Sequence, residues 1–82
     1  MKIVFLLQAE EELLSLHDPL FSKIIRRIEL VKTYPHLGAA MTGPFESYRS
    51  LVVDFYRIYY RLLPDGEIVV THLRDCRRKP GA

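Results

Sequence analysis

The sequence has one cysteine, four glycines and five prolines among 82 residues, and its longest uninterrupted apolar run is Ile3–Leu7. A lone cysteine cannot close an intramolecular disulfide, so we expect a reducing, cytoplasmic compartment. The apolar run is too short to cross a bilayer and follows a single lysine without a small-residue cleavage site. We therefore expect neither a membrane span nor a signal peptide.

The scarcity of glycine and proline, together with 49% hydrophobic and 27% charged residues, excludes a disordered or low-complexity segment. A chain of 82 residues can fill only one hydrophobic core. Residues 1–82 are therefore predicted to form a single globular domain.

Several chemical motifs are also missing. The sequence has no glycine-rich phosphate loop, no cysteine–histidine cluster at zinc spacing and no Ser/His/Asp pattern. Predicted strands and loops separate His17, His36 and His72, so we expect no metal site and no cofactor. Cys76 has no partner base and is not a candidate nucleophile.

The formal net charge of +2 is too small to indicate nucleic-acid binding by itself, but the charge is unevenly distributed. Residues 1–41 carry equal numbers of basic and acidic side chains, whereas six of the seven basic residues after position 41 are arginine. Guanidinium groups match phosphate and carboxylate geometry, so we predict that an anionic partner binds at Arg74, Arg77 and Arg78 in the string RDCRRK. The alternative is a basic tail that only maintains solubility or pairs with acidic neighbours.

The first half of the sequence predicts a strand and two helices. Lys2–Leu7 is rich in Ile, Val and Phe, which indicates a strand that is covered on both faces or central in a small sheet. A helix begins near Gln8, and Asp18–Pro19 starts a second helix that Tyr34–Pro35 ends, because Asp is a favoured N-cap and Pro is tolerated in the first turn. The apolar face of the second helix consists of Phe21, Ile24, Ile25, Ile28 and Val31.

The second half predicts a loop and three strands. His36–Phe45 contains two glycines and a proline and is predicted to be an extended loop. The apolar period then changes to two over Tyr48–Val53, Phe55–Leu63 and Glu67–Leu73, and Pro64-Asp65-Gly66 supplies a tight turn between the last two strands.

Alternation along the middle strand separates two faces. The core face, which we expect to pack with Ile24 and Ile28, consists of Tyr56, Ile58, Tyr60 and Leu62. The other face, whose mixture of aromatic and basic side chains apolar packing does not explain, consists of Phe55, Arg57, Tyr59 and Arg61. The predicted fold is α+β with the order β-α-α-β-β-β, in which a helical hairpin packs on an antiparallel-rich twisted sheet.

The stretch YRSLVVDFYRIYYRLLPDGEIVVTHLRDCRRKP carries a family resemblance. It contains Y-R-I-Y-Y on the middle strand, a D-G turn, a hydrophobic strand and a closing R-R before a proline. In this order these features resemble the RelE/ParE superfamily of toxins from type II toxin–antitoxin modules, and the upstream strand, helical hairpin and H-L-G loop fit as well. The resemblance implies a growth-inhibiting toxin that a cognate antitoxin neutralises, with a role in plasmid stabilisation.

The resemblance leaves the target open. RelE-like members cut messenger RNA in the ribosomal A site, and ParE-like members inhibit DNA gyrase. The low net charge and an incomplete set of nuclease residues favour a ParE-like or divergent activity. The alternatives are a ribosome-dependent mRNA endoribonuclease and an inactive member that retains only antitoxin binding.

Carried over residue by residue, the ribonuclease pattern of the family is matched in part. Arg57, which follows a tyrosine on the middle strand, and Arg77, which follows the last strand, match basic positions of the family. The family also has two lysines on the strand after the loop. Arg49 matches one of them in charge, whereas Leu51 occupies the position of the other. The RelE-type C-terminal tyrosine has no counterpart. If the protein is a nuclease, the resemblance implies Arg49, Arg57 and Arg77 as its phosphate-facing catalytic groups.

A general base is harder to assign from the sequence. Glu46 and His72 are the titratable candidates, but neither matches a family position, and we expect His72 to face the margin of the core. Tyr48, Tyr59 and Tyr60 could stack on bases, although aromatic residues at strand spacing also suit a core.

Overall fold

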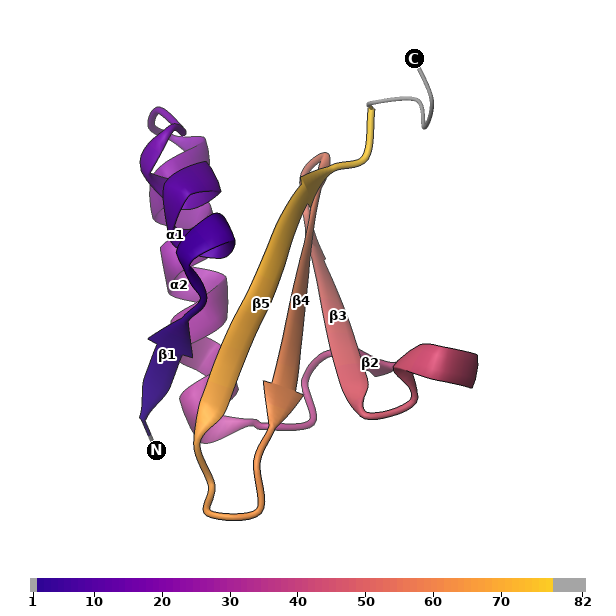
Figure 1. The fold of residues 1–82 in the computed structure, drawn as a ribbon. Helices are drawn as coiled ribbons and strands as arrows, with labels where there is room; N and C mark the ends of the chain where they lie inside the picture. Colours follow the sequence, from indigo (N-terminus) through magenta and orange to yellow (C-terminus); the bar gives the residue numbers. More distant parts are fainter. Residues whose placement is uncertain (1, 78–82) are drawn as a thin grey trace.

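The computed structural model describes residues 2–77 and contains two helices on one side of a five-stranded sheet (Figure 1). The elements are β1 (Ile3–Phe5), α1 (Leu7–Leu14), α2 (Leu20–Thr33), β2 (Ala39–Ala40), the 3-10 helix η1 (Gly43–Phe45), β3 (Tyr48–Val53), β4 (Tyr56–Leu62) and β5 (Ile68–Asp75). This arrangement confirms the predicted α+β fold and its element order. Neither helix in this part of the chain is long and apolar enough to span a membrane.

The strand order in the sheet is β1-β5-β4-β3-β2, with β1 parallel to β5 and the other pairs antiparallel. The expectation that the first strand is central or covered on both faces is wrong, because β1 lies at an edge and its residues are only half-buried. Its apolar run is explained by Ile3 and Phe5, which pack against the core. The predicted loop His36–Phe45 also contains a short edge strand, β2, and η1.

The helices form where the sequence places their apolar residues. Ala9 and Leu13 are the buried residues of α1, and Ile24, Ile28 and Val31 are those of α2. The carboxylate of Asp18 accepts hydrogen bonds from the Ser22 hydroxyl at 2.5 Å and from the Ser22 backbone N–H at 3.0 Å. These two bonds lower the pKa of Asp18 and tie it to the first turn of α2, whose N-cap is Pro19 and not the predicted Asp18.

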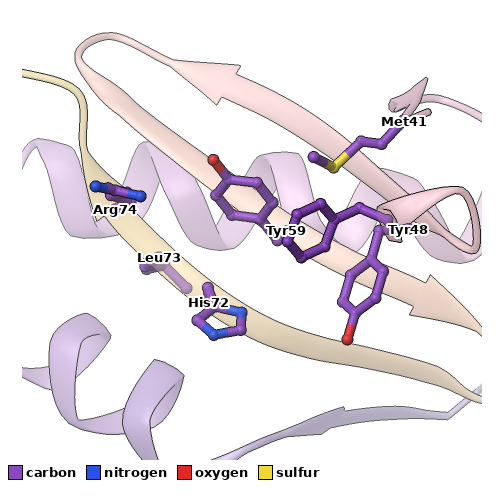
Figure 2. A pocket seen from close by; sticks show the side chains of 7 residues that line it. Met41, Tyr48, Tyr59, His72, Leu73 and Arg74 are labelled. Atoms are coloured by element: carbon purple, nitrogen blue, oxygen red, sulfur yellow. The ribbon is translucent and has the colours of Figure 1, made fainter. Parts of the chain in front are cut away.

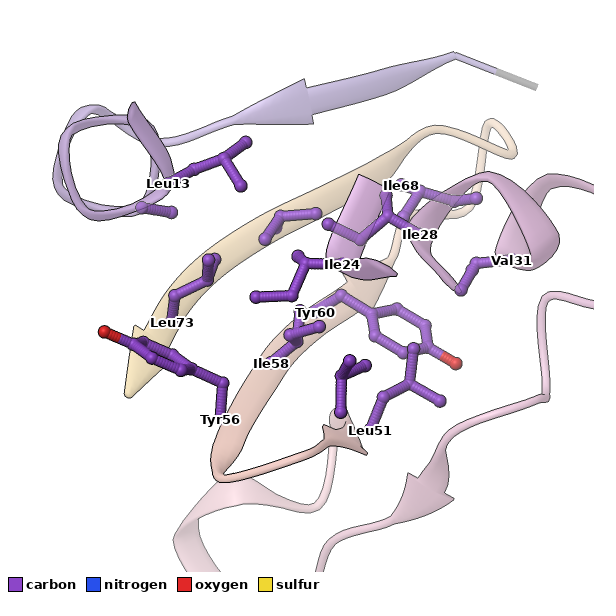
Figure 3. Close-up of a cluster of buried hydrophobic side chains, with 13 residues drawn as sticks. Leu13, Ile24, Ile28, Val31, Leu51, Tyr56, Ile58, Tyr60, Ile68 and Leu73 are labelled. Carbon is purple, nitrogen blue, oxygen red and sulfur yellow. The ribbon is translucent and has the colours of Figure 1, made fainter. Parts of the chain in front are cut away.

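The core lies between the helices and one face of the sheet (Figure 3). Ile24 of α2 and Ile58 of β4 are both fully buried in it, which confirms the prediction that the second helix and the middle strand share one core. Fully burying an isoleucine stabilises a fold by about 1.5–3 kcal/mol, so this pair holds α2 to the sheet.

Tyr60 joins the core to the loop after α2. Its hydroxyl donates to the carbonyl of Pro35 at 2.9 Å and accepts from the N–H of Gly38 at 2.8 Å. A Cβ at position 38 would lie 2.8 Å from the Tyr60 ring and 2.9 Å from the carbonyl oxygen of Ser50, so only glycine fits there. Burial raises the pKa of Tyr60, while the Gly38 hydrogen bond and the charge of Arg49 act in the opposite direction.

We predict that Tyr60→Phe lowers the free energy of unfolding by about 1–3 kcal/mol, because it leaves the half-buried Pro35 carbonyl and the buried Gly38 N–H without a partner. Chemical denaturation at neutral pH measures this loss. Because the folded-state pKa of Tyr60 is raised, the stability that its hydroxyl contributes is present below pH ~10 and is lost as the pH rises through the folded-state pKa. The difference in the free energy of unfolding between wild type and Tyr60→Phe should therefore shrink in strong alkali.

Tyr59→Phe is the matched control. Tyr59 is the neighbouring tyrosine on the opposite face, and its hydroxyl makes no hydrogen bond within residues 2–77. Its removal should change stability by less than about 0.5 kcal/mol. Equal losses in the two variants would refute the role assigned to the Tyr60 hydroxyl.

Candidate functional site on the open face of the sheet

The face of the sheet opposite the helices, here called the open face, carries the polar and aromatic residues of three strands (Figure 2). Cross-strand pairs bring them together in rows: Arg57 lies opposite Arg74, Tyr59 opposite His72, and Tyr48 opposite Arg61. This is the mixed aromatic and arginine face that the alternation of the middle strand predicts.

A β-bulge determines what β5 contributes to this face. The register between β4 and β5 shifts at Tyr59/Tyr60, so that Tyr60 pairs with Val70 whereas Tyr59 pairs with His72. Thr71 is the extra residue, and its hydroxyl donates to the carbonyl of Tyr59 at 3.3 Å. Without the extra residue, alternation from the buried Val70 would turn His72 and Arg74 toward the core.

The bulge therefore corrects the expectation for His72. Its side chain is exposed on the open face and does not lie at the core margin, while Leu73 takes the buried position. Sequence alternation alone could not reveal this reversal, because no glycine or proline marks the bulge.

A groove of about 450 Å³ crosses the open face. Its lining consists of Met41, Phe45, Tyr48, Tyr59, His72, Leu73 and Arg74. The Phe45 and Tyr48 rings meet edge to face at 5.8 Å between centroids, and the Tyr59 and His72 rings do so at 6.0 Å. Flat apolar rings beside a guanidinium can hold an unstacked base and its phosphate.

Three arginines of this face make no ion pair within residues 2–77: Arg61, which lies over the Tyr48 ring at 5.3 Å, and the cross-strand pair Arg57 and Arg74. Arg57 and Arg74 are both exposed, and neither guanidinium makes an ion pair or hydrogen bond within residues 2–77. Like charges directly opposite each other on adjacent strands destabilise a sheet by a few tenths of a kcal/mol or more. A bound anion would remove that repulsion, so this pair is the strongest candidate for an anion site.

His72 is held by hydrogen bonds on both ring nitrogens. Its Nε2 lies 2.9 Å from Nε2 of Gln8, and its Nδ1 lies 3.0 Å from Oγ1 of Thr71. The Gln8 amide also donates to the Thr71 carbonyl at 3.2 Å, which fixes its orientation. We assign the neutral tautomer from this network: Nε2 accepts from Gln8, and Nδ1–H donates to Thr71.

The structure does not bring the three predicted catalytic arginines together. Arg49 pairs with the buried Tyr60 on the core side of the sheet, and its Nη1 donates to the carbonyl of Gly38 at 2.7 Å. Leu51, the second expected lysine position, is buried as well. The open-face positions of β3 are instead Ser50 and Val52, which carry no charge.

Arg77 lies at the end of the sheet. Its guanidinium stacks 3.6 Å from the centroid of Phe55 and bonds to the Asp75 carboxylate at 3.3 Å. The Asp75 hydrogen bond raises the pKa of Arg77. The contacts with Asp75 and Phe55 hold this guanidinium at the margin of the open face. Arg78, the third residue predicted for partner binding, lies outside the described residues.

Sequence reasoning missed several residues of the groove. Met41 and Phe45 come from the predicted loop, and β2 and η1 position them beside β3. The sequence predicts Gln8 only as the start of a helix, and nothing in it connects Gln8 to His72 across 64 positions. Glu46 is exposed at the end of η1 and does not line the groove.

Two helices on one face of a five-stranded sheet define a known class of small α+β protein: the chain has the fold of the RelE toxins. The isolated RelE toxin of E. coli superimposes with a TM-score of 0.81 and 15% identity over 96% of this chain and 87% of that protein. The RelBE2 toxin–antitoxin complex of Mycobacterium tuberculosis superimposes with a TM-score of 0.79 and 16% identity over 90% of this chain and 95% of that chain.

An archaeal RelE–RelB complex from Pyrococcus horikoshii superimposes with a TM-score of 0.74 and 16% identity over 95% of this chain and 97% of that chain. Comparison of the sequence with protein-family models and with curated proteins finds no match. At 15–16% identity the structural likeness establishes the fold.

We predict that sulfate stabilises the wild-type protein more than Arg57→Gln, because the anion relieves the repulsion between Arg57 and Arg74. At a sulfate concentration ten times its Kd, binding adds about 1.4 kcal/mol to the free energy of unfolding. Thermal unfolding at constant ionic strength measures the difference. Lys32→Gln, which removes one charge from the exposed side of α2, controls for general salt effects. A sulfate response in Arg57→Gln equal to that of wild type would exclude Arg57 from an anion site.

Proposed function

We propose that the protein is the toxin of a type II toxin–antitoxin module and that it inhibits growth by cleaving RNA at the open face. The observation that carries the proposal is the unneutralised pair Arg57 and Arg74 beside a positioned imidazole, on a RelE fold. The proposal places the protein in the cytoplasm, where its target and its antitoxin are, and accounts for a role in plasmid stabilisation.

The groups of the open face suit cleavage by the 2′-hydroxyl of the RNA itself. The hydroxyl oxygen attacks the adjacent phosphorus, and its proton passes to Nε2 of His72 once the Gln8 amide moves aside. The bond from phosphorus to the 5′-oxygen of the next nucleotide breaks, that oxygen takes a proton from solvent, and a 2′,3′-cyclic phosphate remains. Arg57 and Arg74 stabilise the charge that develops on the phosphoryl oxygens. Phe45 and Tyr48 present ring surfaces on which a base can stack.

This assignment changes the predicted catalytic set. Arg57 keeps its role, Arg74 supplies the second cation in place of Arg49, and Arg77 remains a third cation at the margin. The general base that the sequence left open is His72, which the bulge turns outward.

ParE-like inhibition of DNA gyrase is the second candidate, and one feature of β3 favours it. The open-face positions Ser50 and Val52 carry no cation, so the site holds fewer positive charges than the nuclease pattern of the family. In that case the open face would bind the surface of gyrase and would not catalyse a reaction.

We predict that Arg57→Ala abolishes growth inhibition while the fold and antitoxin binding are retained. Removing one group that stabilises a transition-state charge costs about a hundred- to a thousandfold in rate. Primer extension on a translated message after induction measures the cleavage, and codon-linked cuts should appear with wild type and disappear with Arg57→Ala. Arg26→Ala on the outer side of α2 is the matched control and should cut normally.

Other results identify the other candidates. Growth inhibition without cuts, together with loss of gyrase supercoiling activity in vitro, would indicate the ParE-like function. No growth inhibition by the wild type, with antitoxin binding intact, would indicate an inactive member. Full toxicity of Arg57→Ala at equal expression would make Arg57 structural.

The proposed partner is a cognate antitoxin with an acidic stretch that contacts Arg74, Arg77 and Arg78. We predict that Arg77→Glu combined with Arg78→Glu weakens antitoxin binding at low salt, because reversed charges repel the acidic stretch. Isothermal titration at two salt concentrations measures the effect. Unchanged affinity at low salt would remove the electrostatic part of this proposal.

A further inference from the structure

Arg61 lies on the open face of β4 and carries a polar group that the proposed mechanism does not use. Its side chain is half-buried, and its Nε atom is buried without a hydrogen-bond partner. No other buried side-chain nitrogen or oxygen of residues 2–77 lacks a partner. A buried charged donor without an acceptor is costly, so this N–H group is suited to an acceptor that a ligand supplies.

The Tyr48 ring holds the Arg61 guanidinium in place. Tyr48 pairs with Arg61 across β3 and β4, and the guanidinium carbon lies 5.3 Å from the ring centroid. A guanidinium over a ring uses its face for this contact, whereas its N–H donors lie in its plane and stay available to an anion. No ion pair within the described part of the chain includes Arg61. Among these residues Arg61 is therefore an oriented cation without an anionic partner.

Arg61 lies at the opposite end of the open face from the cross-strand pair Arg57 and Arg74. Pairing arranges the face in three rows, which are Arg61 with Tyr48, Tyr59 with His72, and Arg57 with Arg74. Figure 2 shows Tyr59 and His72 between Tyr48 and Arg74. Arg61 is four residues from Arg57 along β4, which is about 13 Å in a strand. Because Tyr48 holds Arg61 in its own row, a phosphate at Arg61 must differ from a phosphate at the other two arginines.

Phe45 adds an open ring beside this cation. It is 53% exposed, lines the open-face groove and meets the Tyr48 ring edge to face. Tyr48 thus contacts both Phe45 and Arg61. Any base can stack on an aromatic side chain, because every base has a π face. A cation near an exposed ring is the combination that binds one nucleotide of a single strand by its phosphate and its base.

We propose that Arg61, Tyr48 and Phe45 form a second nucleotide subsite, which binds single-stranded RNA on the side of His72 away from Arg57 and Arg74. Nε of Arg61 donates to a phosphate, and the Phe45 ring stacks on a base. Cations then flank the reacting row on both sides, and an extended strand crosses His72. An acidic peptide would pair with Arg61 but has no flat base to cover Phe45. The inference rests on the proposed function in taking RNA as the ligand, and it gives that site a minimum length of strand.

The test uses the purified protein and 2′-O-methylated RNA, which cannot be cleaved because it has no free 2′-hydroxyl. The Nε–H signals of the arginines are followed by NMR while a tetranucleotide, a dinucleotide or inorganic phosphate is added. The tetranucleotide should shift the signals of Arg57, Arg61 and Arg74 together, with one affinity. The dinucleotide is too short to span the three rows and should bind at least tenfold more weakly.

Variants of Arg61 separate a phosphate contact from a packing role. Arg61→Gln should weaken tetranucleotide binding at least tenfold and reduce the slope of log K against log salt by about 0.7, the value for one phosphate contact on a single strand. Arg61→Lys keeps the charge and should retain the slope. Arg27→Gln, which removes one charge from α2 outside the open-face groove, should bind within twofold of wild type. A role confined to packing on Tyr48 would change stability but leave the salt slope unchanged.

Each other outcome overturns the proposal. An unshifted Arg61 signal at millimolar tetranucleotide, or an unchanged salt slope in Arg61→Gln, would exclude the subsite. Equal affinity for phosphate and tetranucleotide would reduce it to a simple anion site, and tighter binding of a capped glutamate peptide would assign Arg61 to a protein partner. Because the assay needs no cleavage, its failure is separate from failure of the proposed function: codon-linked cuts by a protein whose Arg61 signal does not shift would refute the subsite alone.

Discussion

The extra residue that β5 carries at Thr71 is the constraint on which the arrangement of the site depends. On its N-terminal side, Ile68 and Val70 face the core; on its C-terminal side, Leu73 does. A regular strand would instead bury His72 and Arg74, and their polar groups would each cost several kcal/mol to desolvate without partners. The Thr71 hydroxyl stabilises the shift through the carbonyl of Tyr59 and also receives the His72 Nδ1–H. One hydroxyl thus sets the register of the sheet and orients the imidazole.

Much of the fold could be predicted from the sequence, because periodicity and boundary residues act locally. The apolar face of α2, the alternation of β4 and the Pro64-Asp65-Gly66 turn all correspond to observed elements. The edge position of β1 could not be predicted, since an apolar strand of three residues is compatible with a central or an edge site until its neighbours are known. The two-residue strand β2 is too short to leave a pattern.

The site was less predictable for physical reasons. Arg57 follows from the alternation of its own strand, but Arg49 depends on the pairing of β3 with β4, and that register directs it to the Gly38 carbonyl. Arg74 and His72 depend on a bulge, which is a property of two strands and not of one. Gln8 reaches His72 only because the parallel pairing of β1 with β5 sets the start of α1 beside the bulge.

The N-terminal strand has a practical consequence for measurement. The Lys2 carbonyl accepts from Ile68 at 2.8 Å and the Leu6 N–H donates to Val70 at 3.0 Å, so the first residues are tied along β5 at one edge of the sheet. The free edge of β3 lies on the other side of the same sheet (Figure 1). A fluorescent label attached ahead of Lys2 would therefore report the rotational diffusion of the folded domain while leaving the free edge of β3 unobstructed.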